Sequence, residues 1–140
     1  MSKKILNSVA VGRQISVFLE DQPGTLSAVA FLLGRNGINI YALSLAEGLG
    51  HGYVRMVVDK PAKALQVLRK AEELTLERDV LLLELSNTPG SLGKVTRKLG
   101  EAGINIEYAY CAGGPSVNQG LVVVRVDSTR KALAILKKLL

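Results

Sequence analysis

The amino-acid sequence contains an internal repeat, and this repeat restricts the possible folds more than any other feature. Aligning residues 15–40 with residues 81–106 gives 11 identities in 26 positions, at a constant offset of 66 residues. The identities include a Pro-Gly pair and two further glycines, which are residues that commonly mark turns. The chain is therefore a tandem duplication, and its fold must be one that each short copy can form.

Apolar periodicity predicts the same order of elements in both copies. Each copy begins with a strand that stops at the Pro-Gly pair, and apolar residues at helical spacing follow. The predicted strands are 15–19, 38–46, 53–58 and 74–76 in copy one, and 80–85, 104–112 and 121–126 in copy two. We expect the first helices to start at Pro23 and Pro89 and to end at Gly37 and Gly103, with Asp59 and Asp127 capping the second helices.

This order predicts an α+β fold, a ferredoxin-like βαββαβ unit repeated twice, with antiparallel sheets and the helices on one face. The predicted domains are residues 14–78 and 79–140, preceded by an N-terminal segment, residues 1–13. The second domain has no last strand, because the chain reaches Leu140 directly after its second helix. The apolar segment Ile5–Val11 either pairs on the edge that copy two leaves open or is a frayed terminus.

The repeated motifs resemble those of the ACT domain family. In both copies a strand ends in Asp/Asn-x-Pro-Gly-x-Leu, a helix follows, and the next strand starts with Gly-Ile-Asn-Ile. The resemblance covers both copies and implies a stand-alone tandem ACT protein, a regulatory module that binds amino acids. It also implies that the ligand lies at an interface between modules, near the first strand-to-helix turn and the start of the second strand. Some serine-binding relatives have a histidine where this chain has Leu19 and Leu85, which argues against serine.

Carried over residue by residue, the resemblance implies ligand contacts at Asp21 and Asn39 in copy one and at Asn87 and Asn105 in copy two. The amides at the start of the first helix suit a ligand carboxylate, and Asp21 suits a ligand ammonium group. The full predicted ligand-binding set is Asp21, Gln22, Gly24, Thr25, Leu26 and Asn39, with Asn87, Thr88, Gly90, Ser91, Leu92 and Asn105.

A purely structural interpretation of these residues remains open. Asp21 and Asn87 suit an Asx-turn or a helix cap equally well. Asn39 and Asn105 suit a role in which they hold the start of a strand by bonding local backbone.

The sequence argues against an enzyme. It has one cysteine, Cys111, and one histidine, His51, so it predicts no disulfide, no Cys or His metal cluster, no cofactor and no catalytic residues. A reducing cytoplasm is the expected location. No apolar run approaches the roughly 18 residues that cross a bilayer, so no membrane partner is expected.

The first helices of the two copies differ in a way that predicts a contact surface. Ala28, Phe31 and Leu32 in copy one correspond to Lys94, Arg97 and Lys98 in copy two. We expect the apolar helix to be covered, either by copy two or by a second chain, and a homodimer is favoured. The alternative is an ordinary scatter of exposed apolar residues.

The sequence as a whole favours a non-catalytic sensor that binds a free amino acid at module interfaces and regulates a partner enzyme. The alternative is a structural regulatory subunit without its own ligand. A less favoured alternative is an RNA-binding ferredoxin-like protein, raised by the net charge of +6. The basic residues lie on predicted helices, however, and no aromatic RNA-recognition motif is present, so nucleic acid is an unlikely partner.

Overall fold

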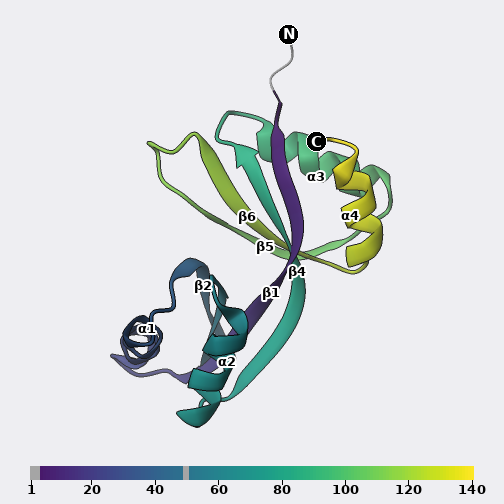
Figure 1. The fold of residues 1–140 in the computed structure, drawn as a ribbon. Helices are drawn as coiled ribbons and strands as arrows, with labels where there is room; N and C mark the ends of the chain where they lie inside the picture. The colour runs from purple at the N-terminus through teal and green to yellow at the C-terminus, as the bar shows by residue number, and fades with distance from the viewer. Residues whose placement is uncertain (1–3, 49–50) are drawn as a thin grey trace. The chain divides into compact units, whose positions relative to one another are not determined.

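The computed structural model describes residues 4–48 and 51–140 (Figure 1). Within these ranges it contains six strands and four helices. The strands are β1 (Leu6–Glu20), β2 (Ile40–Gly48), β3 (His51–Val58), β4 (Thr75–Ser86), β5 (Ile106–Ala112) and β6 (Gln119–Val126). The helices are α1 (Thr25–Arg35), α2 (Pro61–Lys70), α3 (Ser91–Glu101) and α4 (Thr129–Lys137). The predicted α+β class with repeated ferredoxin-like units is confirmed.

Residues 13–78 form one compact unit. Its strands are hydrogen-bonded in the order β2-β3-β1-β4, and β3 is antiparallel to both β1 and β2. Alternate residues of a strand point to the same face of its sheet. The face that carries Ile15, Val17 and Leu19 forms a core with apolar residues of α1 and α2. Both helices therefore cover the same face of this sheet.

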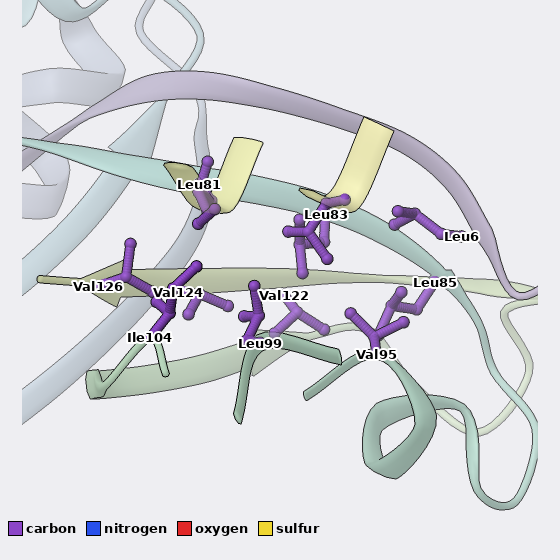
Figure 2. Close-up of a cluster of buried hydrophobic side chains, with 12 residues drawn as sticks. Leu6, Leu81, Leu83, Leu85, Val95, Leu99, Ile104, Val122, Val124 and Val126 are labelled. Atoms are coloured by element: carbon purple, nitrogen blue, oxygen red, sulfur yellow. The ribbon is translucent and has the colours of Figure 1, made fainter. Parts of the chain in front are cut away.

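Residues 79–140, together with the chain up to Gly12, form the other compact unit. Its strands follow the order β1-β4-β6-β5. Figure 2 shows its core, in which Leu81, Leu83 and Leu85 of β4 converge with side chains of β6 and α3. Leu6 of β1 joins this core and is only 1% exposed. The backbone N–H of Ser86 donates to the carbonyl of Ile5 at 2.8 Å, which joins β4 to the chain just before β1.

Two strands are much longer than the sequence pattern suggests. Strand β1 has 15 residues and joins the predicted first strand to residues 6–11 of the N-terminal apolar segment. Strand β4 has 12 residues and joins the predicted last strand of copy one to the first strand of copy two. The charged residues 77–79, which lie between those two predicted strands, belong to β4. Glu77 forms an ion pair with Arg13 at 2.9 Å, and the carbonyl of Asp79 accepts a hydrogen bond from Arg125 at 2.7 Å.

The predicted starts of the helices are wrong, whereas the predicted exits of the first helices are confirmed. Pro23 and Pro89 lie before the helices, which begin at Thr25 and Ser91. Gly37 adopts a φ of 72° directly after α1. Its N–H donates to the carbonyl of Gly34, while the N–H of Ile38 donates to the carbonyl of Leu33, both at 3.0 Å. These two bonds form the usual glycine-based helix ending.

The two aspartates predicted as helix caps have another role. The cap positions of α2 and α4 are Lys60 and Ser128, and within the described residues no side chain caps either helix. Asp59 instead accepts a hydrogen bond from the backbone N–H of Asn39 at 2.9 Å. Asp127 accepts the equivalent bond from Asn105 at 3.2 Å. Each aspartate therefore ties the end of one strand to the start of another.

Candidate functional site

The turn between β1 and α1 has a well-defined backbone geometry. Gly24 adopts φ 91° and ψ −7°, which are the angles of the third residue of a type II turn. The turn spans Gln22 to Thr25, and the N–H of Thr25 donates to the carbonyl of Gln22 at 3.4 Å. The hydroxyl of Thr25 also donates to the carbonyls of Glu20 and Gln22, each at 3.1 Å. This turn type needs a residue such as glycine at its third position, and proline is common at its second.

The turn presents free backbone N–H groups at the start of α1. The first bond along the helix is donated by the N–H of Ala28 to the carbonyl of Gly24 at 2.9 Å. The N–H groups of Leu26 and Ser27 precede this bond, so they have no acceptor within the helix. Such groups, together with the helix dipole, favour an anion.

A cavity of about 430 Å³ lies at this turn. Five of the six residues predicted for copy one line it, namely Asp21, Gln22, Gly24, Thr25 and Leu26. The remaining wall includes Leu45, Ala46 and Glu47 at the end of β2. This volume is within the usual range for sites that bind small molecules.

Carboxylates dominate the electrostatics of this cavity. Glu20, Asp21 and Glu47 line it and are all exposed. In the part of the chain that the structure describes, none of their three carboxylates forms a hydrogen bond or an ion pair. The cavity therefore combines acceptors for a cationic group with helix N–H donors for an anionic group.

A second cavity, of about 570 Å³, shares part of this turn. It has Leu19, Glu20 and Thr25 in common with the first cavity. It extends to residues that sequence analysis did not select for the site, namely Phe18, Ala28, His51, Glu72, Glu73 and Leu74. Glu72 has a φ of 63°.

Asn39 does not lie near Asp21 within this unit. Gly48 at the end of β2 is opposite His51, and His51 is opposite Glu20 at the end of β1. Asn39 precedes the other end of β2, where its N–H donates to Asp59 and its carbonyl accepts from the N–H of Asp59 at 3.0 Å. The turn residues of copy one are thus brought together, and Asn39 is at the opposite end of the sheet.

The equivalent turn of copy two uses its polar groups internally. The amide nitrogen of Asn87 donates to the carbonyl of Val117 at 2.9 Å, and its backbone N–H donates to the carbonyl of Asn118 at 2.8 Å. Asn87 therefore holds the connection between β5 and β6. The hydroxyls of Thr88 and Ser91 bond to each other at 2.7 Å.

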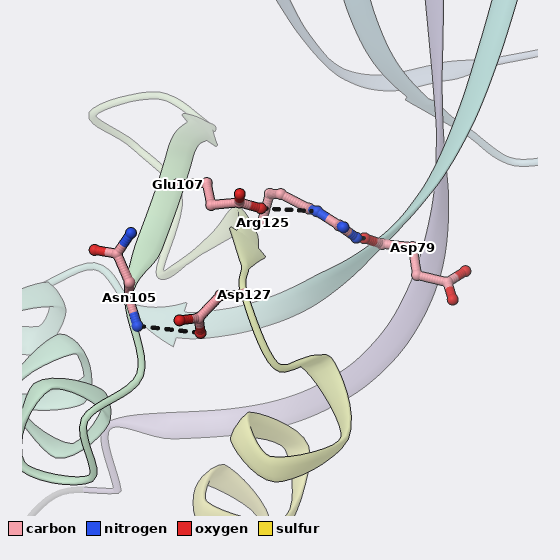
Figure 3. Close-up of polar contacts among 5 residues, drawn as sticks. All are labelled: Asp79, Asn105, Glu107, Arg125 and Asp127. Carbon is pink, nitrogen blue, oxygen red and sulfur yellow. Dashed lines mark hydrogen bonds and ion pairs between the residues drawn. The ribbon is translucent and has the colours of Figure 1, made fainter.

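The rest of the copy-two set follows the pattern of copy one. Gly90 has a φ of 87° and so repeats the type II turn. Leu92 is exposed at the start of α3. Asn105 lies far along the chain from this turn, and its backbone N–H, not its carboxamide, makes the bond to Asp127 (Figure 3). Asn87, Thr88, Gly90, Ser91 and Leu92 share one turn, and Asn105 shares a strand start with Asp127.

Two negative observations apply to residues 4–48 and 51–140. These residues contain no group of three or more His, Cys, Asp or Glu side chains that could hold a metal ion. None of their helices is long and apolar enough to span a membrane.

Comparison with protein families matches residues 10–140 to the ACT domain pair. The chain belongs to the ACT domain family. The match extends over both copies of the repeat, so the resemblance seen in the turn and strand motifs is confirmed. A search of curated protein sequences gives no significant match.

Three solved structures illustrate what the chain is similar to. Protein BT0572 from Bacteroides thetaiotaomicron is 34% identical, with a TM-score of 0.85, and the match covers 93% of this chain and 89% of that chain. The regulatory subunit of aspartate kinase from Thermus thermophilus, in its ligand-free form, is 22% identical with a TM-score of 0.70, covering 97% and 98%. The same subunit from Thermus flavus is 20% identical with a TM-score of 0.65, covering 97% and 99%.

Sequence analysis missed the part of this ACT pair's cavity that comes from β2. Leu45, Ala46 and Glu47 were not selected, because they carry no repeated motif. The connectivity nevertheless contains a signal that points to them. Strands β2 and β3 form a hairpin, so the end of β2 must lie where β3 begins, which is also where β1 ends. Within this unit, the residues of the second strand that lie beside the β1–α1 turn are therefore those at its end and not those at its start.

Proposed function

We propose that this ACT pair is a non-catalytic regulatory module that binds a free amino acid at the β1–α1 turn of copy one. The cavity of about 430 Å³ with an exposed Asp21 carboxylate beside the first turn of α1 carries the proposal. An amino acid is a zwitterion, so it needs an acceptor for its ammonium group and donors for its carboxylate. Asp21 supplies the acceptor, and the N–H groups of Leu26 and Ser27 supply the donors.

In this proposal copy one is the main binding copy. The amide nitrogen of Asn87 is already committed to the carbonyl of Val117, and Asn87 lacks the negative charge of Asp21. Asn39 and Asn105 hold the starts of their strands through their backbone N–H groups, and they are not walls of the copy-one cavity.

A second chain is proposed to complete the module. Phe31 on α1 is 67% exposed, so it offers a large apolar side chain to a covering surface. Leu43 and Leu45 are exposed on β2, the edge strand of this sheet, and Leu45 also lines the cavity. An unpaired edge with exposed leucines favours association with another chain, so a homodimer would bring a second wall to the ligand.

The regulatory role is supported by the fold that the chain shares with regulatory subunits of aspartate kinase. We infer that ligand binding changes the surface offered to a partner enzyme, because a ligand shifts an equilibrium only through differential contacts. Cys111 is an exposed free thiol, which suits a reducing compartment such as the cytoplasm.

A thermal-shift screen of the twenty amino acids, followed by titration calorimetry, tests the proposal. A ligand present at about a hundred times its dissociation constant should stabilise the protein by about 2.7 kcal/mol. Asp21→Asn should weaken binding at least about tenfold, because it removes a charge-assisted bond. Asp79→Asn makes the same change at an exposed aspartate in the other unit and should leave affinity unchanged. If no amino acid stabilises the protein, the alternative of a structural subunit without its own ligand is favoured.

A further inference from the structure

A third cavity lies in the unit that contains copy two, and its chemistry differs from that of the amino-acid site. It measures about 580 Å³ and lies between α3, the chain at the start of β1 and the end of α4. Its apolar side chains are Ile5, Leu6, Val95 and Leu139. Its charged side chains are Lys4, Lys94, Arg97, Lys98 and Glu101. Ile5 and Leu139 are half-buried, whereas Leu6 and Val95 are almost fully buried, so the cavity offers a small aliphatic surface beside an excess of positive charge.

The cations come from two separate segments. Lys94, Arg97 and Lys98 are spaced so that they share one face of α3, and Lys4 approaches from the start of β1. Lys98 is close to Glu101, with 4.0 Å between Nζ and Oε2, and both side chains are more than half exposed. Among the described residues, Lys4, Lys94 and Arg97 have no ion-pair partner. Three cations are thus available to a ligand.

Copy one provides an internal comparison for this charge. The α1 positions equivalent to Lys94, Arg97 and Lys98 of α3 are occupied by Ala28, Phe31 and Leu32. The copy-one cavity beside α1 is lined by Glu20, Glu72 and Glu73 instead. The positive charge is therefore specific to copy two and is not a requirement of the shared fold.

The geometry points to a binding site for an organic anion with a short aliphatic tail, such as a medium-chain carboxylate or alkyl phosphate. The anionic group would lie against Lys4, Lys94 and Arg97, and the tail would cover the exposed parts of Ile5 and Leu139. The cavity volume suits a small molecule. Among the residues that the structure describes, no aromatic side chain on which a nucleobase could stack lines it. This site is separate from the proposed amino-acid site, and neither proposal depends on the other.

Amide NMR titration of the full chain with octanoate tests this site. Octanoate should shift the resonances of Leu6, Val95 and Leu139, and it should bind at least about threefold more tightly than acetate or octanol, which lack the tail or the charge. The double variant Lys94→Gln/Arg97→Gln should bind octanoate about three- to tenfold more weakly, as expected for exposed charge pairs. The control variant Lys63→Gln/Arg69→Gln makes the same substitutions at exposed positions of α2 in the other unit and should bind normally.

Two results would overturn the proposal. The first is an affinity for octanoate that is no higher than the affinities for octanol and acetate. An affinity for octanoate that is equal in the wild-type protein and the Lys94/Arg97 variant counts in the same way. The second is tighter binding of hexaglutamate than of octanoate at the same residues, which would indicate an acidic protein partner. The comparison among octanoate, octanol and acetate uses only the wild-type protein, so it decides the question even if the double variant fails to fold.

Discussion

Replacing Leu6 by alanine tests whether the N-terminal part of β1 is an integral part of the unit that contains copy two. The Leu6 side chain is 1% exposed and lies in a core formed with β4, β6 and α3. The substitution removes three carbon groups, and at about 0.8 kcal/mol each the lost burial alone amounts to about 2.4 kcal/mol. The cavity left behind increases the cost, so we expect a loss of about 2.5–4 kcal/mol in the free energy of unfolding.

Urea denaturation followed by circular dichroism measures this loss, and Leu76→Ala is the matched control. Leu76 lies on β4 and is 49% exposed, so its replacement should cost less than about 1 kcal/mol. Amide hydrogen exchange should also become faster in β5 and β6 of the Leu6 variant, because the unit as a whole loses stability. If Leu6→Ala cost no more than Leu76→Ala, the segment would be a loosely attached terminus and the structural reasoning would be wrong.

Three other substitutions test the turn, the strand start and the proposed dimer. Gly24→Ala should cost about 1–2 kcal/mol of stability in urea denaturation, because alanine at a φ of 91° is strained. The control is Gly34→Ala within α1, where the added Cβ meets no atom within 4 Å. This variant should be more stable than the wild-type protein by about 0.5–1 kcal/mol. Asp59→Ala should cost about 1 kcal/mol, because the N–H of Asn39 loses its acceptor; equal stability of this variant and the wild-type protein would argue against the role assigned to Asp59. Phe31→Lys should convert a dimer to a monomer in light scattering coupled to gel filtration, and an unchanged mass would exclude α1 from the contact surface.

Turn residues made most of the fold predictable from the sequence. The Pro-Gly pairs and the glycines after the first helices occur twice at the same offset. All four of these glycines adopt a positive φ, a backbone conformation that only glycine tolerates well. The prediction that the first helices start at the prolines was wrong, because proline suits both the first residue of a helix and the second residue of a type II turn. The choice depends on the φ of the following glycine, which the pattern does not contain.

The long strands could not be predicted from the pattern of apolar residues. Residues 77–79 are charged and interrupt the alternation, so Leu74–Leu76 and Val80–Leu85 looked like separate strands. Their charges are compatible with a strand because Glu77 meets Arg13 from the neighbouring β1. Cross-strand pairs of this kind stabilise a sheet, but the partner can be identified only when the register is known. The same limit explains why Glu47, which lines the candidate cavity, could not be selected from the sequence.

The duplicated turn also shows how far one copy can substitute for the other, and Asn87→Asp is the variant that tests it. Equal roles for the two turns would mean that Asn87→Asp creates a second amino-acid site. The contacts of Asn87 argue otherwise, because its amide nitrogen donates to the carbonyl of Val117. An aspartate there would place an oxygen against that carbonyl, where no donor remains. We expect the variant to lose about 1–3 kcal/mol of stability, with faster hydrogen exchange between β5 and β6 and no additional amino acid bound in calorimetry. A second bound amino acid with unchanged stability would contradict this interpretation of the copy-two turn.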